Sequence, residues 1–240
     1  MRQEESAKFI ATNRANLAAA KKGVASAVNA AEEILAPALA GGHGHLPALI
    51  CDDRSLSFSE LDALSNRFGN VLKSRGVARG DRVLFALADT PELVAGYLGA
   101  IKIGAVPAAL STRLSARELG QLIADSGPRA LALQRTALPR LGEIDPRSLP
   151  SFVALAGDGG DDGAPWPDIA KLAAAAPMAL DIADMAADDT ALLVYTSGTT
   201  GAPKAAEHRL VAVLELPQAL LRLLARRDVQ GDAVPEPGRA

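Results

Sequence analysis

The residues best suited to chemistry lie in one stretch near the carboxyl end of the chain, YTSGTTGAPK at 195–204. Seven small or hydroxylated residues follow the apolar run 191–195, and the stretch ends on a lysine. Glycine lets the backbone approach an anion closely, and consecutive N–H groups can form an anion-binding concavity. The lysine adds a mobile positive charge. The stretch predicts a phosphate-binding loop formed by Thr196, Ser197, Gly198, Thr199, Thr200, Gly201 and Lys204.

Two other interpretations of this stretch fit its residues less well. A flexible Ser/Thr/Gly linker is seldom preceded by an apolar strand or closed by Pro-Lys. A P-loop NTPase needs two glycines five positions apart, with Lys and then Ser or Thr directly after the second. Here Gly198 and Gly201 are three apart, Lys204 lies three positions further on, and Ala205 follows it. The spacing therefore excludes a Walker loop.

The elements that must position this loop alternate between strands and helices. Two capping boxes with the pattern S-x-x-E, at 57–60 and 115–118, and the pair Thr90-Pro91 predict helix starts. A further helix is expected around 168–175. Short apolar runs typical of strands precede, separate or follow these helices, at 48–51, 55–57, 82–88, 105–110, 129–133 and 191–195. Strand, helix and strand at this spacing predict an α/β fold with parallel-sheet βαβ layers.

Composition narrows the class of protein. The net charge is −3 and aromatic residues make up 3% of the chain, so a nucleic-acid partner is not expected. The single cysteine, Cys51, excludes an intramolecular disulfide and fits a reducing compartment. The N-terminus has no apolar signal region, and charges and a proline interrupt the apolar tract 210–225, which is shorter than the ~20 residues of a membrane span. A cytoplasmic protein without a membrane span is expected.

Neither group of candidate metal ligands has the pattern of a metal site. His43 and His45 lie in the Gly-rich turn GGHGH without a third ligand nearby, which favours a solvated loop. The spacing of the carboxylates at 158, 161 and 162 does not match an EF-hand calcium loop, which favours an acidic connector. No metal-binding residues are predicted.

The stretch YTSGTTGAPK resembles the signature of the AMP-forming acyl-CoA synthetases, the adenylate-forming ligases that include luciferases and peptide-synthetase adenylation domains. In that signature an apolar residue, here Leu193, precedes two free positions, two small or hydroxyl residues, Gly, two hydroxyl-type residues, Gly, a free position, Pro and Lys. Two upstream segments, SFSELDALSNRFGNVLKSRGVARGDRV at 57–83 and LGAIKIGAVPAALSTRLS at 98–115, are similar to early segments of the family. The resemblance covers roughly 28–206 and leans towards benzoate-type CoA ligases.

The resemblance implies the N-terminal domain of an adenylate-forming ligase and the cofactors ATP, Mg²⁺ and coenzyme A. Such a ligase joins a small carboxylic acid to AMP with release of pyrophosphate, and a thiol, usually coenzyme A, then takes the acyl group. The loop would hold the β- and γ-phosphates of ATP: Thr196, Ser197, Thr199 and Thr200 would donate hydrogen bonds. Gly198 and Gly201 would allow close approach, and Lys204 would supply charge.

The resemblance weakens after Lys204. The family continues with Gly and, several residues later, His, whereas this chain reads AAEHRL at 205–210. Later family motifs for adenine, ribose and the reacting carboxylate are missing. We therefore expect an incomplete domain at 28–206, a helical or frayed extension at 1–27 and a divergent, possibly frameshifted tail at 207–240. Such a chain would be an inactive or incomplete acid–CoA ligase that pairs with a missing C-terminal part, or alternatively a non-catalytic remnant or nucleotide-binding module.

Overall fold

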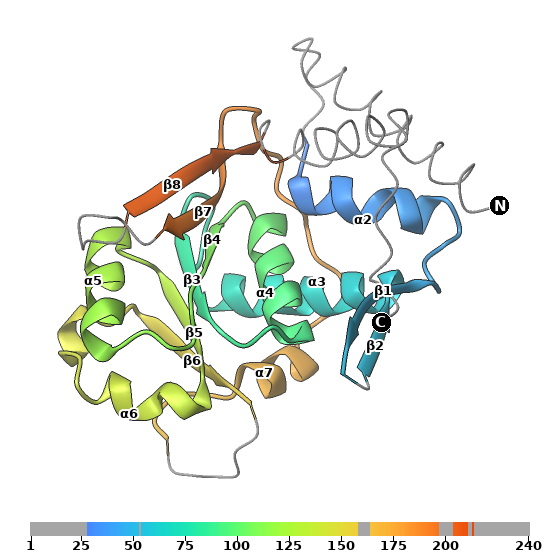
Figure 1. The fold of residues 1–240 in the computed structure, drawn as a ribbon. Helices are drawn as coiled ribbons and strands as arrows, with labels where there is room; N and C mark the ends of the chain where they lie inside the picture. The colour runs from blue at the N-terminus through green and yellow to red at the C-terminus, as the bar shows by residue number, and fades with distance from the viewer. Residues whose placement is uncertain (1–27, 53, 158–163, 197–203, 211–212, 214–240) are drawn as a thin grey trace, which may run out of the picture.

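The computed structural model describes residues 28–52, 54–157, 164–196, 204–210 and 213 (Figure 1). The expected N-terminal extension, the acidic loop around 158–163 and most of the expected tail lie outside the described residues. The helices are α2 (Ala30–Ala40), α3 (Phe58–Ser74), α4 (Pro91–Lys102), α5 (Ala116–Ser126), α6 (Leu138–Leu141) and α7 (Ile169–Ala175), with short 3₁₀ turns at Arg135–Ala137 and Pro146–Ser148. The strands are β1 (Pro47–Cys51), β2 (Arg54–Ser57), β3 (Arg82–Ala86), β4 (Val106–Ala109), β5 (Ala130–Gln134), β6 (Phe152–Ala156), β7 (Thr190–Thr196) and β8 (Lys204–Arg209).

The main sheet has six strands in the order β6-β5-β3-β4-β7-β8. The first five run parallel to their neighbours, and only β8 is antiparallel, to β7. This confirms the predicted α/β fold with a parallel sheet. The two short strands expected at 48–51 and 55–57 pair with each other as a separate antiparallel hairpin, β1–β2.

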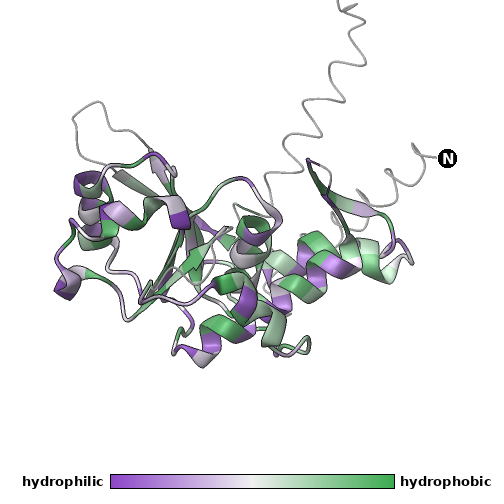
Figure 2. Cartoon of the chain, turned by 90° about the horizontal axis from the view of Figure 1, so that it is seen from below, coloured by the Kyte–Doolittle hydropathy of each residue, from purple (hydrophilic) through white to green (hydrophobic). Residues whose placement is uncertain are grey.

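Helices cover both faces of the sheet, and each face has its own hydrophobic core. One core joins α2, α3, α4 and α7 to the sheet and includes Phe68, Phe85 and Ile101. The other joins α5 and α6 to the opposite face and includes Leu84, Leu122 and Leu141. Figure 2 shows hydrophobic residues gathered in the central strands, between helices whose surfaces are mixed. The parallel strands are therefore buried from both sides, as their continuous apolar runs predict.

Helices α3 and α4 pack through glycine. A Cβ atom added at Gly99 of α4 would lie 2.5 Å from the carbonyl oxygen of Ser65 and 2.8 Å from the amide nitrogen of Gly69, both on α3. The two backbones are therefore close enough that a side chain at Gly99 has no room.

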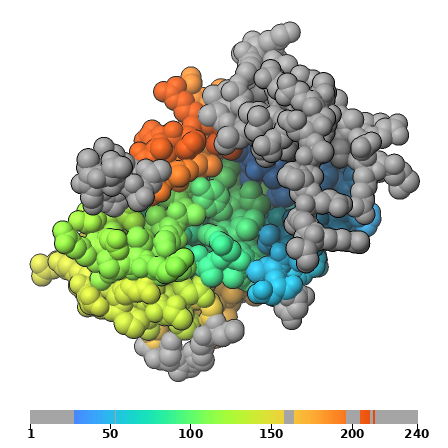
Figure 3. Space-filling model, in the orientation of Figure 1, coloured from blue at the N-terminus to red at the C-terminus, as the bar shows by residue number. Residues whose placement is uncertain are grey.

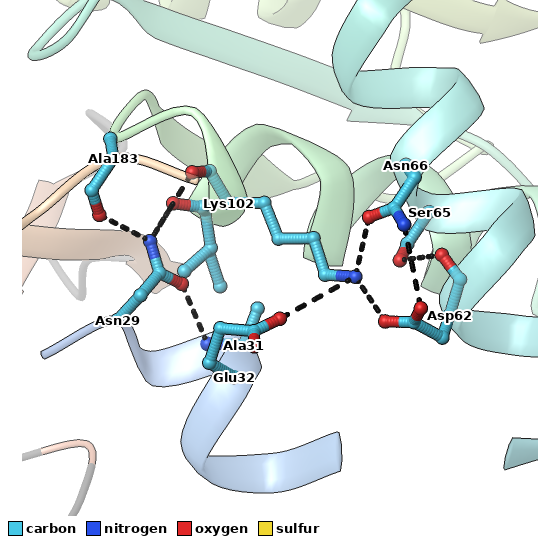
Figure 4. A network of polar contacts seen from close by, with 9 residues as sticks. Asn29, Ala31, Glu32, Asp62, Ser65, Asn66, Lys102 and Ala183 are labelled. Carbon is cyan, nitrogen blue, oxygen red and sulfur yellow. Dashed lines mark hydrogen bonds and ion pairs between the residues drawn. The ribbon is translucent and has the colours of Figure 1, made fainter. Parts of the chain in front are cut away.

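A buried ammonium group ties three helices together on the same face of the sheet (Figure 4). Lys102, at the end of α4, has no exposed surface, and its Nζ lies 2.5 Å from Asp62 Oδ1 and 2.7 Å from Asn66 Oδ1, both on α3. Glu32 Oε1 of α2 lies 3.8 Å from the same nitrogen. A buried charge of this kind is tolerated because opposite charge and hydrogen-bond acceptors surround it.

Candidate functional site

The predicted phosphate-binding loop connects the two strands of the β7–β8 hairpin. Thr196 is the last residue of β7 and Lys204 is the first residue of β8, and the two are paired across the hairpin. Ser197, Gly198, Thr199, Thr200 and Gly201 lie outside the described residues, as do the side chains of Thr196 and Lys204. The structure therefore brings together the main chains at the two ends of the predicted site.

The hairpin presents this loop at a favourable edge of the sheet. Strand β7 runs parallel to β4, so the loop follows the carboxyl end of a strand in a parallel sheet. Open α/β sheets bind ligands in the crevice outside the carboxyl ends of their strands. The turns that follow β3, β4 and β5 leave the sheet at the same edge. Figure 3 shows the hairpin at the molecular surface, in orange. This placement is compatible with a ligand that approaches from solvent.

Tyr195, the first residue of YTSGTTGAPK, fastens the hairpin to a helix. Its hydroxyl donates to Asp125 Oδ2 of α5 at 3.1 Å. Burial, and to a smaller degree the neighbouring Asp125 carboxylate, raises the pKa of the Tyr195 phenol, so the group stays protonated and keeps its donor at neutral pH. Sequence reasoning missed this contact, because the tyrosine and the aspartate are far apart in the chain and no local pattern links them.

Charged residues hold the other end of the hairpin. Arg209 Nη1 lies 3.0 Å from Asp188 Oδ1, and Arg79 forms an ion pair with Asp189. The amide nitrogen of Leu210 donates to the carbonyl oxygen of Asp189 at 2.9 Å. The contacts of Arg209 and Leu210 join β8 and its end to the segment that leads into β7, and the Arg79 contact joins that segment to the turn before β3.

A pocket of about 170 Å³ lies beside these contacts. Its lining comes from the amino ends of β3, β4 and β7 and from Glu207 of β8, and includes Arg79, Arg82, Asp189 and Thr190. It is thus at the opposite end of β7 from the signature loop. The pocket is therefore separate from the predicted phosphate site.

The remaining sequence candidates contribute no assembled site in the described part of the chain. No group of three or more His, Cys, Asp or Glu side chains is close enough there to hold a metal ion. Cys51 is half-buried, and its Sγ donates to the carbonyl oxygen of Asp89 at 3.3 Å. Among the helices within the described ranges, none has the length and apolarity needed to cross a membrane.

Comparison with known proteins identifies the relatives of this chain. Residues 38–228 match the model of a family described as AMP-binding enzyme. A 3-hydroxybenzoate–CoA ligase of Aromatoleum sp. (strain CIB) is 42% identical over 198 residues, which are 78% of this chain and 36% of that protein. A 3-hydroxybenzoate–CoA/4-hydroxybenzoate–CoA ligase of Thauera aromatica is 42% identical over 191 residues, with the same two shares. The chain thus spans about a third of the length of these curated relatives.

Solved structures agree with the sequence relatives. The crystal structure of the anthranilate CoA ligase AuaEII in complex with anthranoyl-AMP superposes with a TM-score of 0.72 at 28% identity, and the match covers 81% of this chain and 36% of that one. The apo structure of MatB from Rhodopseudomonas palustris matches with a TM-score of 0.66 at 28% identity, over 82% of this chain and 38% of that one. The resemblance to adenylate-forming ligases and its lean towards benzoate-type enzymes are confirmed.

Proposed function

Since the chain belongs to the AMP-binding enzyme family of AMP-forming acid–CoA ligases, we propose that it carries the ATP-phosphate-binding part of such a ligase. Its substrates are ATP, coenzyme A and a small aromatic carboxylic acid of the hydroxybenzoate type. The observation that carries the proposal is the complete signature at 195–204, which spans the turn of a hairpin at the carboxyl edge of the sheet. The names of the two hydroxybenzoate–CoA ligases support the class of acid.

The proposed reaction has two steps. A carboxylate oxygen of the acid bonds to the α-phosphorus of ATP, the bond from that phosphorus to the bridging oxygen breaks, and pyrophosphate leaves. The thiol sulfur of coenzyme A then bonds to the acyl carbon, and AMP leaves with the electron pair of the acyl–oxygen bond while the thiol proton passes to solvent. The loop residues hold the β- and γ-phosphates by hydroxyl and N–H donors, and Lys204 supplies positive charge. Their contribution is to position the departing group and to stabilise its charge.

We assign the metal to the substrate: the nucleotide binds as its Mg²⁺ complex, with phosphate oxygens as ligands, which is a common arrangement for this ion. A cytoplasmic location fits the single half-buried cysteine, because such a thiol persists in a reducing compartment.

A second candidate is a nucleotide-binding module without turnover of its own. The signature at 195–204 supports this candidate as well, because the role it implies is to hold the phosphates of a nucleotide. We expect the 240 residues by themselves to bind nucleotide and to release little or no pyrophosphate.

Calorimetric titration with Mg²⁺-ATP tests the proposal. Binding should weaken about tenfold in Lys204→Ala, because a charge-assisted contact to phosphate is worth roughly 1.4 kcal/mol. Lys171→Ala is the matched control, since Lys171 lies exposed on α7 and its loss should leave the Kd unchanged. Absence of binding by the unaltered chain, or equal effects of the two variants, would contradict the proposed site.

Pyrophosphate release separates the two candidates. The chain is incubated with Mg²⁺-ATP, coenzyme A and a panel of acids that includes 3-hydroxybenzoate, 4-hydroxybenzoate, benzoate and a fatty acid. Release that depends on the aromatic acid supports a ligase active by itself. Binding without release supports the nucleotide-binding module.

A further inference from the structure

The pocket of about 170 Å³ at the amino ends of β3, β4 and β7 has the lining of a small-molecule site. Its apolar part is formed by Val106, Met185 and Leu193, each of which is only 5% exposed. The charged and hydroxyl groups of its lining come from Arg79, Arg82, Asp189, Thr190 and Glu207. Ligand pockets typically combine an apolar surface with a few polar groups that orient the ligand.

The register of four neighbouring strands puts two opposite charges on one face of the sheet (Figure 1). Arg82 of β3 is paired with Val106 of β4, and Leu193 of β7 is paired with Glu207 of β8. Paired residues of neighbouring strands point to the same face of a sheet. Val106 and Leu193 both belong to the core on the α5 face. Arg82 and Glu207 therefore point to that face as well, with the two apolar side chains between them.

Within the described part of the chain, neither of these two charges belongs to an ion pair. Arg82 donates through Nε to the carbonyl oxygen of Ser126 at the end of α5, which holds the guanidinium in place. The Thr190 hydroxyl lies 3.5 Å from Oε2 of Glu207. Strands β4 and β7 separate β3 from β8, so the usual strand spacing puts the two backbones about 14 Å apart. A positive and a negative group thus border a shared space.

One wall of the pocket is held by contacts within the protein. Met185 lies in the connector 183–189, and its amide nitrogen donates to the carbonyl oxygen of Val28 at 3.2 Å. Asn29, which caps α2, donates through Nδ2 to the carbonyl oxygen of Ala183 at 3.1 Å. The start of α2 therefore holds the connector against the sheet. A pocket with walls fixed in this way loses little freedom when a ligand binds.

We propose that this pocket binds a small zwitterion, namely an amino acid with a short apolar side chain. The carboxylate of the ligand pairs with the Nη groups of Arg82, its ammonium group pairs with Glu207, and its side chain packs on Val106 and Leu193. The two charges of a zwitterion match the two charges of the pocket, whereas a simple anion would be attracted by Arg82 and repelled by Glu207. A ligand held in this way connects the edge strand β8 to β3.

Titration of the full chain with three compounds, followed through its amide NMR signals, tests the site. Leucine carries both charges, 4-methylpentanoate lacks the ammonium group, and 3-methylbutylamine lacks the carboxylate, while the apolar part is the same in all three. Leucine should shift the amide signals of the pocket residues. Each of the other two compounds should bind about threefold more weakly or worse, because a pair of exposed charges contributes modestly to binding.

Substitutions assign each charge of the ligand to a residue. In Glu207→Gln the preference for leucine over 4-methylpentanoate should disappear, and in Arg82→Gln the preference for leucine over 3-methylbutylamine should disappear, because each variant removes the partner of one ligand group. The controls Glu143→Gln and Arg117→Gln change exposed residues outside the pocket lining and should keep both preferences. If Arg82→Gln does not fold, because Arg82 also contacts the end of α5, Glu207→Gln decides the outcome alone.

Three results would overturn the proposal. They are the absence of leucine-induced shifts at the pocket, equal binding of the three compounds, and a preference for leucine over 4-methylpentanoate that survives in Glu207→Gln. Equal binding of leucine and 4-methylpentanoate by the unaltered chain would indicate a plain carboxylate site and would also exclude the zwitterion. The titration uses neither ATP nor coenzyme A, so its result does not depend on the proposed function.

Discussion

The close contact between α3 and α4 makes Gly99 the position where the smallest side chain should do the most damage. In Gly99→Ala, the new methyl group would lie 2.5 Å from a carbonyl oxygen, whereas ordinary contacts begin near 3.4 Å. Both clashing atoms of α3 at under 3.0 Å belong to its backbone and cannot rotate away. The two helices must therefore separate by roughly 0.9 Å, which opens gaps elsewhere in a close-packed interior.

The expected cost follows from two opposing effects. Overpacking of a core costs about 1–3 kcal/mol, and contact with backbone favours the upper end. Alanine gains about 1 kcal/mol over glycine in a helix. The free energy of unfolding should therefore fall by about 2 kcal/mol, and Tm should fall by about 4–8 °C for a chain of this length.

Gly120→Ala is the matched control, because Gly120 also lies inside a helix, α5, and a Cβ atom there would meet nothing within 4 Å. The same substitution should raise the free energy of unfolding by about 0.5–1 kcal/mol. Urea unfolding of both variants and the unaltered chain measures the difference, which should be close to 3 kcal/mol. If Gly99→Ala is as stable as Gly120→Ala, the close approach of α3 and α4 is wrong.

Two further substitutions follow from buried polar groups. Lys102→Met removes the ammonium group that donates to Asp62 and Asn66, and it should lower the free energy of unfolding by roughly 3 kcal/mol. The control Lys171→Met, on the exposed side of α7, should change the free energy of unfolding by less than about 0.5 kcal/mol in the same urea assay. Burial raises the pKa of the Tyr97 phenol from 10.0 to about 12. The unfolded chain releases this proton first, so the stabilising effect of the neutral phenol is complete below pH 10 and disappears as the pH rises to about 12. Tyr97→Phe should flatten that alkaline loss of stability, and a tyrosinate absorbance in which both tyrosines of the folded chain titrate with a midpoint near pH 10 would contradict the burial.

Local signals in the sequence predicted most of the fold. The capping boxes of Ser57 with Glu60 and Ser115 with Glu118 are both formed, because each depends only on residues three apart. Helix α4 begins at Pro91 as expected, although Thr90 makes no side-chain capping bond. Strand β6 was not predicted, because several prolines and short turns separate it from β5 and interrupt the regular alternation of strands and helices.

Longer-range features could not be predicted from local patterns. Strand β8 has the sequence KAAEHR, without the apolar alternation of a strand, and it forms because β7 offers an edge to pair with. The residues of the candidate site are predicted from the signature alone. The contact that joins the hairpin to α5, from Tyr195 to Asp125, and the contact from Asn29 to Ala183 join residues 70 and 154 positions apart. Such pairs follow only from the assembled fold.

The strand order also sets the sequence of events in folding. Strand β7 lies beside β4, yet its registered pair joins residues 85 positions apart, with β5, β6 and α7 between them in the chain. Closing so long a loop costs entropy before its contacts are made, so local units such as β3–α4–β4 should assemble earlier. The hairpin that carries the signature loop is then among the last parts to join the sheet, and its Ala191 and Leu193 complete the two cores as it does so.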